Sequence, residues 1–252
     1  GSKRDMPDHQ INIIDTPGSD DFVGEILSSM KVADLGIMLL NAAHGVEVGT
    51  ELIWEYKEKF QLPGMFIINQ CDHEKADFDT TLEQAIARFG IKLIPFQYPL
   101  NQRKNFNAII DALRMVMYEF GPDGGKPIKK EIPASELSRA KEMHNRIVEA
   151  AAENDDTLME HFFETGTLEE SELADGLRKG IAKQQIFPVF CCSALKNMGT
   201  GRIMGFINDV CPSPADRPAA KTLQGELAID PNGPTTLFIY KTFTEPKVGK
   251  RS

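Results

Sequence analysis

Short apolar runs alternate along this chain with segments in which apolar residues recur at helical spacing. Four of the runs are rich in Ile, Leu, Val and Phe and nearly uninterrupted, which is typical of strands buried on both faces of a parallel sheet. They are Ile11–Ile14, Leu35–Leu40, Met65–Ile68 and Phe187–Cys192. Because helices are predicted between them, the pattern indicates an α/β fold with crossover helices.

Three helices are predicted beside these strands. Their apolar positions are Val48, Leu52, Tyr56 and Phe60 in the first, Leu82, Ile86 and Phe89 in the second, and Ile203, Phe206, Ile207 and Val210 in the third. Asp79 is the expected N-cap of the second helix, and Gly90 its expected stop.

Far more chain than one crossover helix separates the third apolar run from the fourth. The predicted elements there are strands at Ile91–Leu100 and Phe106–Leu113, a helix with an apolar stripe from Leu137 to Ala151, and a helix opened by the capping box Thr167-x-x-Glu170. His144 lies on the apolar stripe, where a packed histidine is expected rather than a metal ligand. We interpret residues 91–184 as an α+β insert.

The chain changes character after the last predicted helix. Three prolines within Pro212–Pro218 predict a linker, and Leu237–Phe243 predicts one strand. A lone strand cannot bury itself, so we expect the natural protein to continue beyond these residues. Gly1-Ser2 is interpreted as the remnant of an expression tag.

Composition excludes several classes of protein. The 252 residues carry a formal charge of −9, which argues against a general nucleic-acid binder and against specific DNA recognition. No apolar run approaches the roughly 18 residues that a membrane span needs. The four cysteines form no Cys-x-x-Cys pair, the spacing typical of zinc sites. Cys191 and Cys192 are expected to be buried strand thiols, which favours the cytoplasm.

The negative charge is concentrated in the predicted insert. Residues 131–184 contain 13 acidic and 6 basic side chains, a net charge of −7. This pattern is compatible with a solvated face and also with a docking surface for a partner.

Polar motifs follow the first and third apolar runs. Asp15-Thr16-Pro17-Gly18 comes directly after the first; the Asp15 carboxylate can hold Mg²⁺ through water, and the Gly18 N–H can approach a terminal phosphate. Asn69-Gln70-Cys71-Asp72 follows the third. The Asp72 carboxylate can accept two hydrogen bonds from the guanine edge, which adenine cannot supply.

A third motif follows the last run, where backbone N–H groups of Ser193, Ala194 and Leu195 can meet the guanine carbonyl. Each motif alone is compatible with an ordinary turn. All three in order, each at the carboxyl end of a predicted strand, indicate a nucleotide site, because that edge is where open α/β sheets bind ligands.

The motifs and their order resemble elongation factor G from about Ile11 to Gly249. Asp15–Phe22 is similar to that family's Asp-Thr-Pro-Gly-His-x-Asp-Phe. Further similar stretches are Ala42–Glu51, Ile132-Pro133-Ala134, Ala151–Asp156, Leu158-Met159-Glu160, Leu177-Arg178-Lys179, Ser193–Asn197, Asp230–Pro234 and Glu245–Gly249.

The resemblance implies a translational GTPase with an incomplete P-loop NTPase-type parallel sheet, an α+β insert and the first strand of a β-barrel domain. The implied parts are residues 1–10 as lead-in, 11–90 as the first part of the GTP-binding core, 91–184 as the insert, 185–211 as the last strand and helix of the core, 212–224 as a linker, and 225–252 as the start of the barrel. The implied nucleotide-binding residues are Asp15, Gly18, Asn69, Gln70, Asp72, Ser193, Ala194 and Leu195, with Asp15 toward Mg²⁺.

The resemblance also implies GTP or GDP as ligand and a cytoplasmic protein that binds ribosomal RNA and stalk proteins. In that family the insert faces the ribosomal stalk, which gives the acidic stretch a partner.

The chain departs from the family pattern at several places. No Gly-x-x-x-x-Gly-Lys-Ser/Thr occurs, since Gly124-Gly125-Lys126 is followed by Pro127, so we expect these residues alone hardly to bind GTP. Ser19 stands where the family has a water-orienting histidine, Gln70 where it has lysine, and Asn41 where aspartate is usual. The first two changes predict weak hydrolysis and weakened nucleotide affinity, and no catalytic residue is assigned.

Three functional hypotheses follow. The chain is part of a hydrolysing translocation factor, part of a paralogue that uses GTP to bind ribosomes and hydrolyses little, or part of a ribosome-protection or release-factor relative. The family match favours the first for broad class, Ser19 and Gln70 favour the second for mechanism, and the insert disfavours the third.

Overall fold

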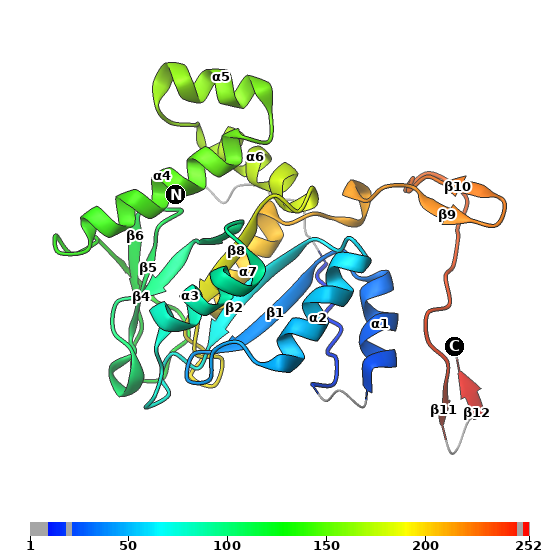
Figure 1. The fold of residues 1–252 in the computed structure, drawn as a ribbon, viewed down its shortest axis with the longest axis horizontal. Helices are drawn as coiled ribbons and strands as arrows, with labels where there is room; N and C mark the ends of the chain where they lie inside the picture. Colours follow the sequence, from blue (N-terminus) through cyan, green and yellow to red (C-terminus); the bar gives the residue numbers. More distant parts are fainter. Residues whose placement is uncertain (1–9, 19–21, 246–248, 252) are drawn as a thin grey trace.

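A four-stranded parallel sheet forms the centre of the molecule in the computed structural model, which describes residues 10–18, 22–245 and 249–251. Its order is β1–β2–β8–β3 (Figure 1). The strands are β1 (Gly36–Asn41), β2 (Gly64–Asn69), β8 (Phe187–Cys191) and β3 (Leu93–Pro95). Three of the four apolar runs thus form the predicted strands, and the α/β class is confirmed.

Helices cover one face of this sheet at α2 (Val48–Lys59) and α3 (Phe78–Phe89). Rings of Trp54, Phe66, Phe89 and Phe187 pack there with neighbouring centroids 5.0–5.5 Å apart. Because side chains alternate along a strand, Phe66 and Ile68 of β2 belong to this core while Met65 and Ile67 belong to the opposite one.

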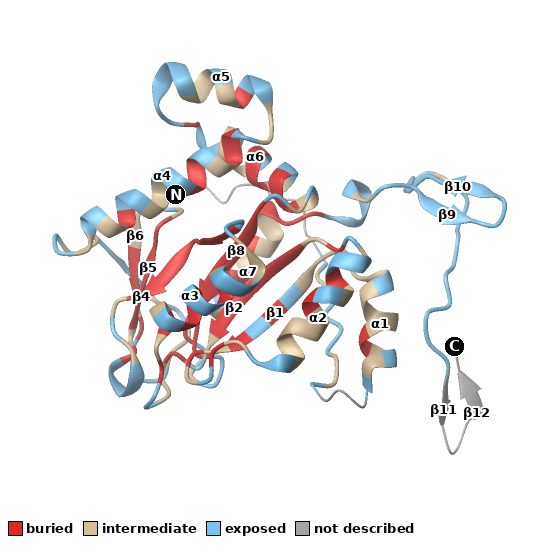
Figure 2. Cartoon of the chain, viewed as in Figure 1, coloured by how far each residue is buried: buried red, intermediate tan, exposed pale blue. Residues whose placement is uncertain are grey.

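The opposite face is covered by α7 (Thr200–Val210), α4 (Leu137–Ala152) and α6 (Glu170–Ala182). Phe190 of β8 lies 4.8 Å from Phe206 of α7, centroid to centroid. Figure 2 shows the buried residues concentrated in the sheet and on the helix faces turned toward it, while α5 (Asp156–Thr165) lies at the periphery and is mostly exposed. Within the described residues, no helix has both the length and the apolar character needed to cross a membrane.

The insert contains a second, antiparallel sheet in the order β4–β5–β6–β7. Its strands are β4 (Gln97–Pro99), β5 (Ala108–Asp111), β6 (Val116–Glu119) and β7 (Ile128–Lys130). The predicted strand Ile91–Leu100 is therefore wrong as one unit: its first part, β3, pairs with β8, and its second part, β4, pairs with β5. The change of sheet occurs at Phe96, which is fully buried and anchors the turn.

The predicted strand Ile11–Ile14 is not observed. Residues 10–17 have no regular structure, and the Ile13 side chain is 78% exposed. Strand β1 pairs only with β2 among the described residues, so no neighbour supplies a ladder for this segment. An apolar run becomes a strand only where a partner's N–H and C=O groups are available.

Two predicted helix caps are displaced along the sequence. Asp77, not Asp79, caps α3, because its carboxylate accepts from Thr80 N at 3.0 Å. The capping box of α6 is formed by Glu169 and Glu172, two residues beyond the predicted position. Gly90 does end α3, with a φ of 103° that favours glycine.

Residues after α7 form short isolated pieces rather than the predicted strand Leu237–Phe243. The elements there are the 3₁₀ turn η3 (Pro214–Asp216), the hairpin of β9 (Ala220–Thr222) with β10 (Gly225–Leu227), and the hairpin of β11 (Phe243–Glu245) with β12 (Gly249–Arg251). The segment touches α1 (Val23–Val32) where Lys241 pairs with Glu25 at 3.1 Å. Without a sheet beside it, an apolar run such as 237–242 gains no strand pairing.

Lys57 is a buried cation at the opposite end of the sheet from the polar motifs. Its side chain is 1% exposed, its Nζ donates to Gln184 Oε1 at 2.6 Å, and it lies 4.1 Å from the Phe187 ring centroid. Burial lowers the pKa of Lys57 to about 8, with Glu58 opposing and Lys92 reinforcing the shift. The folded protein therefore disfavours the charged amine.

Replacing Lys57 by Met should change how the free energy of unfolding depends on pH. The folded pKa lies below the unfolded value of roughly 10.4, so the penalty for the charged amine is complete below pH 8 and disappears as pH rises to the unfolded value. The free energy of unfolding of the Met variant relative to wild type should fall by about 1–3 kcal/mol over that window. Urea unfolding at several pH values measures this difference.

Lys59→Met is the matched control, because Lys59 lies on the same helix and is exposed. Ionisation of unfolded cysteines affects all three proteins alike and cancels in the comparison. A difference between Lys57→Met and wild type that does not vary with pH contradicts the assignment.

Candidate nucleotide-binding site

The carboxyl ends of β2 and β8 are joined by the side chain of Asn69. Asn69 Oδ1 accepts a hydrogen bond from Ala194 N at 3.0 Å and one from Cys192 Sγ at 3.4 Å. Burial raises the pKa of the Cys192 thiol to about 12, so it remains a neutral donor. A second link runs along the backbone, where Cys71 N donates to Cys192 O at 3.2 Å. These contacts place the second and third predicted motifs side by side.

Gln70 is held toward the end of β1 by the side chain of Asn41. Asn41 Nδ2 donates to Gln70 Oε1 at 3.1 Å, and Gln70 has a φ of 61°, in the left-handed region that non-glycine residues seldom occupy. Asn41 and Gln70 are the two positions at which the sequence departs from aspartate and lysine. The structure joins them as a neutral amide pair.

Asp72 and Leu195 present the polar groups that remain available at this edge. The Asp72 side chain is 15% exposed and pairs with Lys196 Nζ at 3.5 Å. The backbone N–H groups of residues 193, 194, 196 and 197 all donate to acceptors in the protein, whereas that of Leu195 has no acceptor among the described residues. The Leu195 side chain is 94% exposed, so its backbone lies at the surface.

Ser193 shapes the turn rather than exposing its hydroxyl. Its side chain is 1% exposed, and its Oγ accepts from Lys196 N at 3.3 Å. Of the predicted site residues, Asn69, Gln70, Asp72, Ser193, Ala194 and Leu195 therefore come together at one edge of the sheet.

Among the described residues, no hydrogen bond or ion pair joins Asp15 or Gly18 to this cluster. Both are exposed, in the extended segment that precedes α1, and Figure 1 draws this segment in dark blue at the end of the molecule where α1 and α2 lie. No group of three His, Cys, Asp or Glu side chains within the described ranges could hold a metal ion. Ser19 lies outside the described residues.

Sequence reasoning missed the contribution of the insert to this edge. Arg103 N donates to Cys71 O at 2.8 Å, and Gln102 Oε1 accepts from Phe78 N at 2.7 Å, so the loop that carries Asp72 rests on the insert. A Gln-Arg pair in a polar turn carries no sequence signal for such a contact.

A parallel sheet covered on both faces, interrupted by an α+β insert, is the architecture of a GTPase domain that carries an insert. Residues 3–213 match the family model of the elongation factor Tu GTP-binding domain, and since this match spans most of the chain, the chain belongs to that family. The resemblance to elongation factor G-like translational GTPases is thereby confirmed.

The fold is also similar to the crystal structure of a protein from Thermus thermophilus. The two share 25% sequence identity with a TM-score of 0.78, and the match covers 94% of this chain and 33% of the other. This chain thus spans about a third of the length of that solved chain.

A double-mutant cycle tests the pair of Asn41 and Gln70. Asn41→Asp alone and Gln70→Lys alone each place one charged side chain beside a neutral one, while the double variant places opposite charges together. We expect a coupling free energy of about 0.5–1 kcal/mol favouring the double variant, as for other exposed pairs. Urea unfolding measures all four proteins, and strictly additive effects contradict the pairing.

Proposed function

We propose that this chain supplies the base-recognition part of the GTP site of an elongation factor G-like protein that acts on the ribosome in translocation. The observation that carries the proposal is the joining of the two guanine motifs by Asn69 and Ala194 at 3.0 Å. This contact brings the Asp72 carboxylate and the Leu195 N–H to the same edge, where open α/β sheets bind ligands.

The available groups fit guanine by their hydrogen-bonding character. Asp72 has acceptor capacity beyond its ion pair with Lys196 and can accept from the ring N–H and exocyclic amine of guanine. The Leu195 N–H can donate to the guanine carbonyl. Adenine offers the reverse pattern at both places, so the arrangement discriminates between the two bases.

We assign the phosphate end to Asp15 and Gly18 from their motif. Asp15 would hold Mg²⁺ through water, and the Gly18 N–H would meet a terminal phosphate. Since the 252 residues contain no Gly-x-x-x-x-Gly-Lys-Ser/Thr loop, they lack the backbone donors and lysine that supply most phosphate affinity.

Calorimetry of this chain with GTP and Mg²⁺ should show no resolvable binding, and micromolar affinity would contradict that expectation.

NMR should nevertheless show base recognition: millimolar GDP should shift the amide signals of Asp72 and Leu195, and ADP should shift them far less. Asp72→Asn should move the preference from guanine to xanthine, because an amide can donate to the xanthine 2-carbonyl. Equal shifts of these amide signals with GDP and with ADP would contradict the assignment of the base site.

The second candidate function is a GTP-dependent ribosome-binding paralogue that hydrolyses GTP weakly or not at all. The neutral Asn41–Gln70 pair favours it, since the family lysine at position 70 would bring a cation to this edge. Ser19 favours it further, because a hydroxyl one bond beyond Cβ cannot reach or polarise the water that a histidine would orient.

Ser19→His should raise ribosome-stimulated GTP hydrolysis by the longest natural polypeptide that contains these residues. Losing a water-positioning group costs on the order of 10²–10⁴-fold in rate, so the gain should be large. Phosphate release with and without ribosomes measures it. Ser19→Ala serves as control and should match wild type; vigorous turnover with Ser19 unchanged rules out the weak-hydrolysis proposal.

The acidic insert gives the proposed ribosome-binding protein a docking surface. Residues 131–184, with their net charge of −7, form α4, α5 and α6 on the outside of the molecule. We assign the proteins of the ribosomal stalk to this surface and the cytoplasm to the protein, and the insert argues against the ribosome-protection or release-factor alternative.

A further inference from the structure

We propose that the insert positions the guanine-recognition loops of this protein, with Gln102, Arg103 and Gly124 as positioning residues. The inference rests on the proposed base site. The loops concerned are the 70–77 loop, which follows β2 and carries Asp72, and the 192–199 loop, which follows β8 and carries Leu195. Each loop is held by a different turn of the insert.

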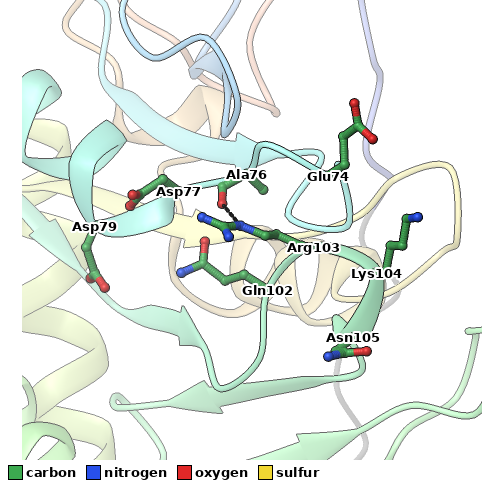
Figure 3. Close-up of a pocket in the computed structure, with 8 residues that line it drawn as sticks. All are labelled: Glu74, Ala76, Asp77, Asp79, Gln102, Arg103, Lys104 and Asn105. Carbon is green, nitrogen blue, oxygen red and sulfur yellow. Dashed lines mark hydrogen bonds between the residues drawn. The ribbon is translucent and has the colours of Figure 1, made fainter.

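The first turn is η2 (Arg103–Asn105), which holds the 70–77 loop at both ends. Arg103 N donates to Cys71 O at 2.8 Å, and Arg103 Nε donates to Ala76 O at 3.2 Å. Figure 3 shows the Arg103 guanidinium directed at Ala76, with Gln102 beside it. Gln102 Oε1 accepts from Phe78 N at 2.7 Å, immediately after the loop.

Arg103 makes these contacts from a strained backbone. Its φ is 67°, a left-handed conformation that costs a non-glycine residue about 1 kcal/mol or more. The conformation lets the N–H and the guanidinium of one residue reach the two ends of the same loop. Asp72 lies between those ends, so its position depends on them.

The second turn, at Gly124 and Gly125, packs against the 192–199 loop. Gly125 N donates to Asn197 O at 2.9 Å. Gly124 lies so close that a Cβ there would stand 1.7 Å from Lys196 O, which is backbone and cannot turn aside. Lys196 directly follows Leu195 and pairs with Asp72, so this contact bears on both base-reading groups.

The two glycines form a matched pair for the test. Both have positive φ, 68° for Gly124 and 78° for Gly125, so alanine carries a similar backbone cost at either position. A Cβ on Gly125 would meet no heavy atom within 4 Å, whereas one on Gly124 would collide with Lys196. Only Gly124→Ala therefore forces the Gly124 turn and the 192–199 loop apart.

Amide hydrogen exchange measures the displacement. In Gly124→Ala the Ala194 amide, which is bonded to Asn69, should exchange about tenfold faster, as expected for loss of one such hydrogen bond. Amides in the middle of β2 and β8 should keep their wild-type rates, and Gly125→Ala should match wild type at Ala194. Equal exchange at Ala194 in the two variants overturns the proposal.

The preference for GDP over IDP tests the positioning role directly, because a contact that only stabilises the fold would leave this preference unchanged. Inosine lacks the exocyclic amine that Asp72 reads, so the ratio of GDP to IDP affinity, from NMR titrations of the full chain, reports the position of Asp72. Wild type and Gly125→Ala should prefer GDP by about tenfold, as a hydrogen bond to a charged group predicts. Gly124→Ala should lose most of this preference.

Variants of Gln102, beside η2, test the proposal if Gly124→Ala does not fold. Gln102→Leu should weaken the preference for GDP, and Gln102→Glu, which keeps the acceptor for Phe78 N, should restore it. If wild type prefers GDP and the Gly124 and Gln102 variants do so equally, the positioning role is wrong while the base site stands. If wild type does not distinguish GDP from IDP, the base site itself is wrong and the positioning role falls with it.

Discussion

The parallel pairing of β2 with β8 is the constraint on which the rest of the structure depends. Its register sets Ile68 opposite Cys191, so the residues that follow each strand leave the sheet at the same height. Asn69 can then accept from Ala194 at 3.0 Å, and Cys71 N can reach Cys192 O. The polar edge is therefore a consequence of strand register, since a shift of one residue would turn these side chains to the other face.

The segment that connects β2 to β8 contains the whole insert, yet it must return the chain to the sheet so that β8 pairs with β2 in this register. Strand β3 makes this possible because it pairs with the free side of β8 before the chain reaches the antiparallel sheet of the insert. At Phe96 the backbone serves both sheets: Phe96 N donates to Val189 O, and Phe96 O accepts from Ala112 N, each at 2.9 Å. The insert thus leaves the core through a buried, hydrogen-bonded residue and not through a flexible linker.

The sequence predicted the strands whose pairing partners are present in the chain. Continuous apolar runs marked β1, β2 and β8, and in β2 and β8 nearly every residue is buried. The strands predicted from the same pattern at Ile11–Ile14 and Leu237–Phe243 are not observed, because apolar character alone does not show whether a neighbouring strand is available for pairing. The N-cap of α3 was misplaced by two residues because Asp77 and Asp79 have equal capping chemistry and only backbone geometry distinguishes them.

The residues that we propose for base reading could be located from the sequence because they follow strands and their chemistry is carried by residue type. Neither the Asn41–Gln70 pair nor the support from the insert could be predicted. The first depends on the left-handed φ of Gln70, and the second on the close approach of Gly124 to Lys196. Gly124-Gly125 did draw attention in the sequence, but as a failed phosphate-loop motif; its positive φ angles serve backbone packing instead.

The acidic surface of the insert is also packed against the core. Helices α4 and α6 do not stand apart from the core, because Ile147, Val148 and Leu177 share one buried cluster with Phe190 of β8. The same packing that covers the sheet thus connects the acidic helices with the strand ends that carry the proposed base site.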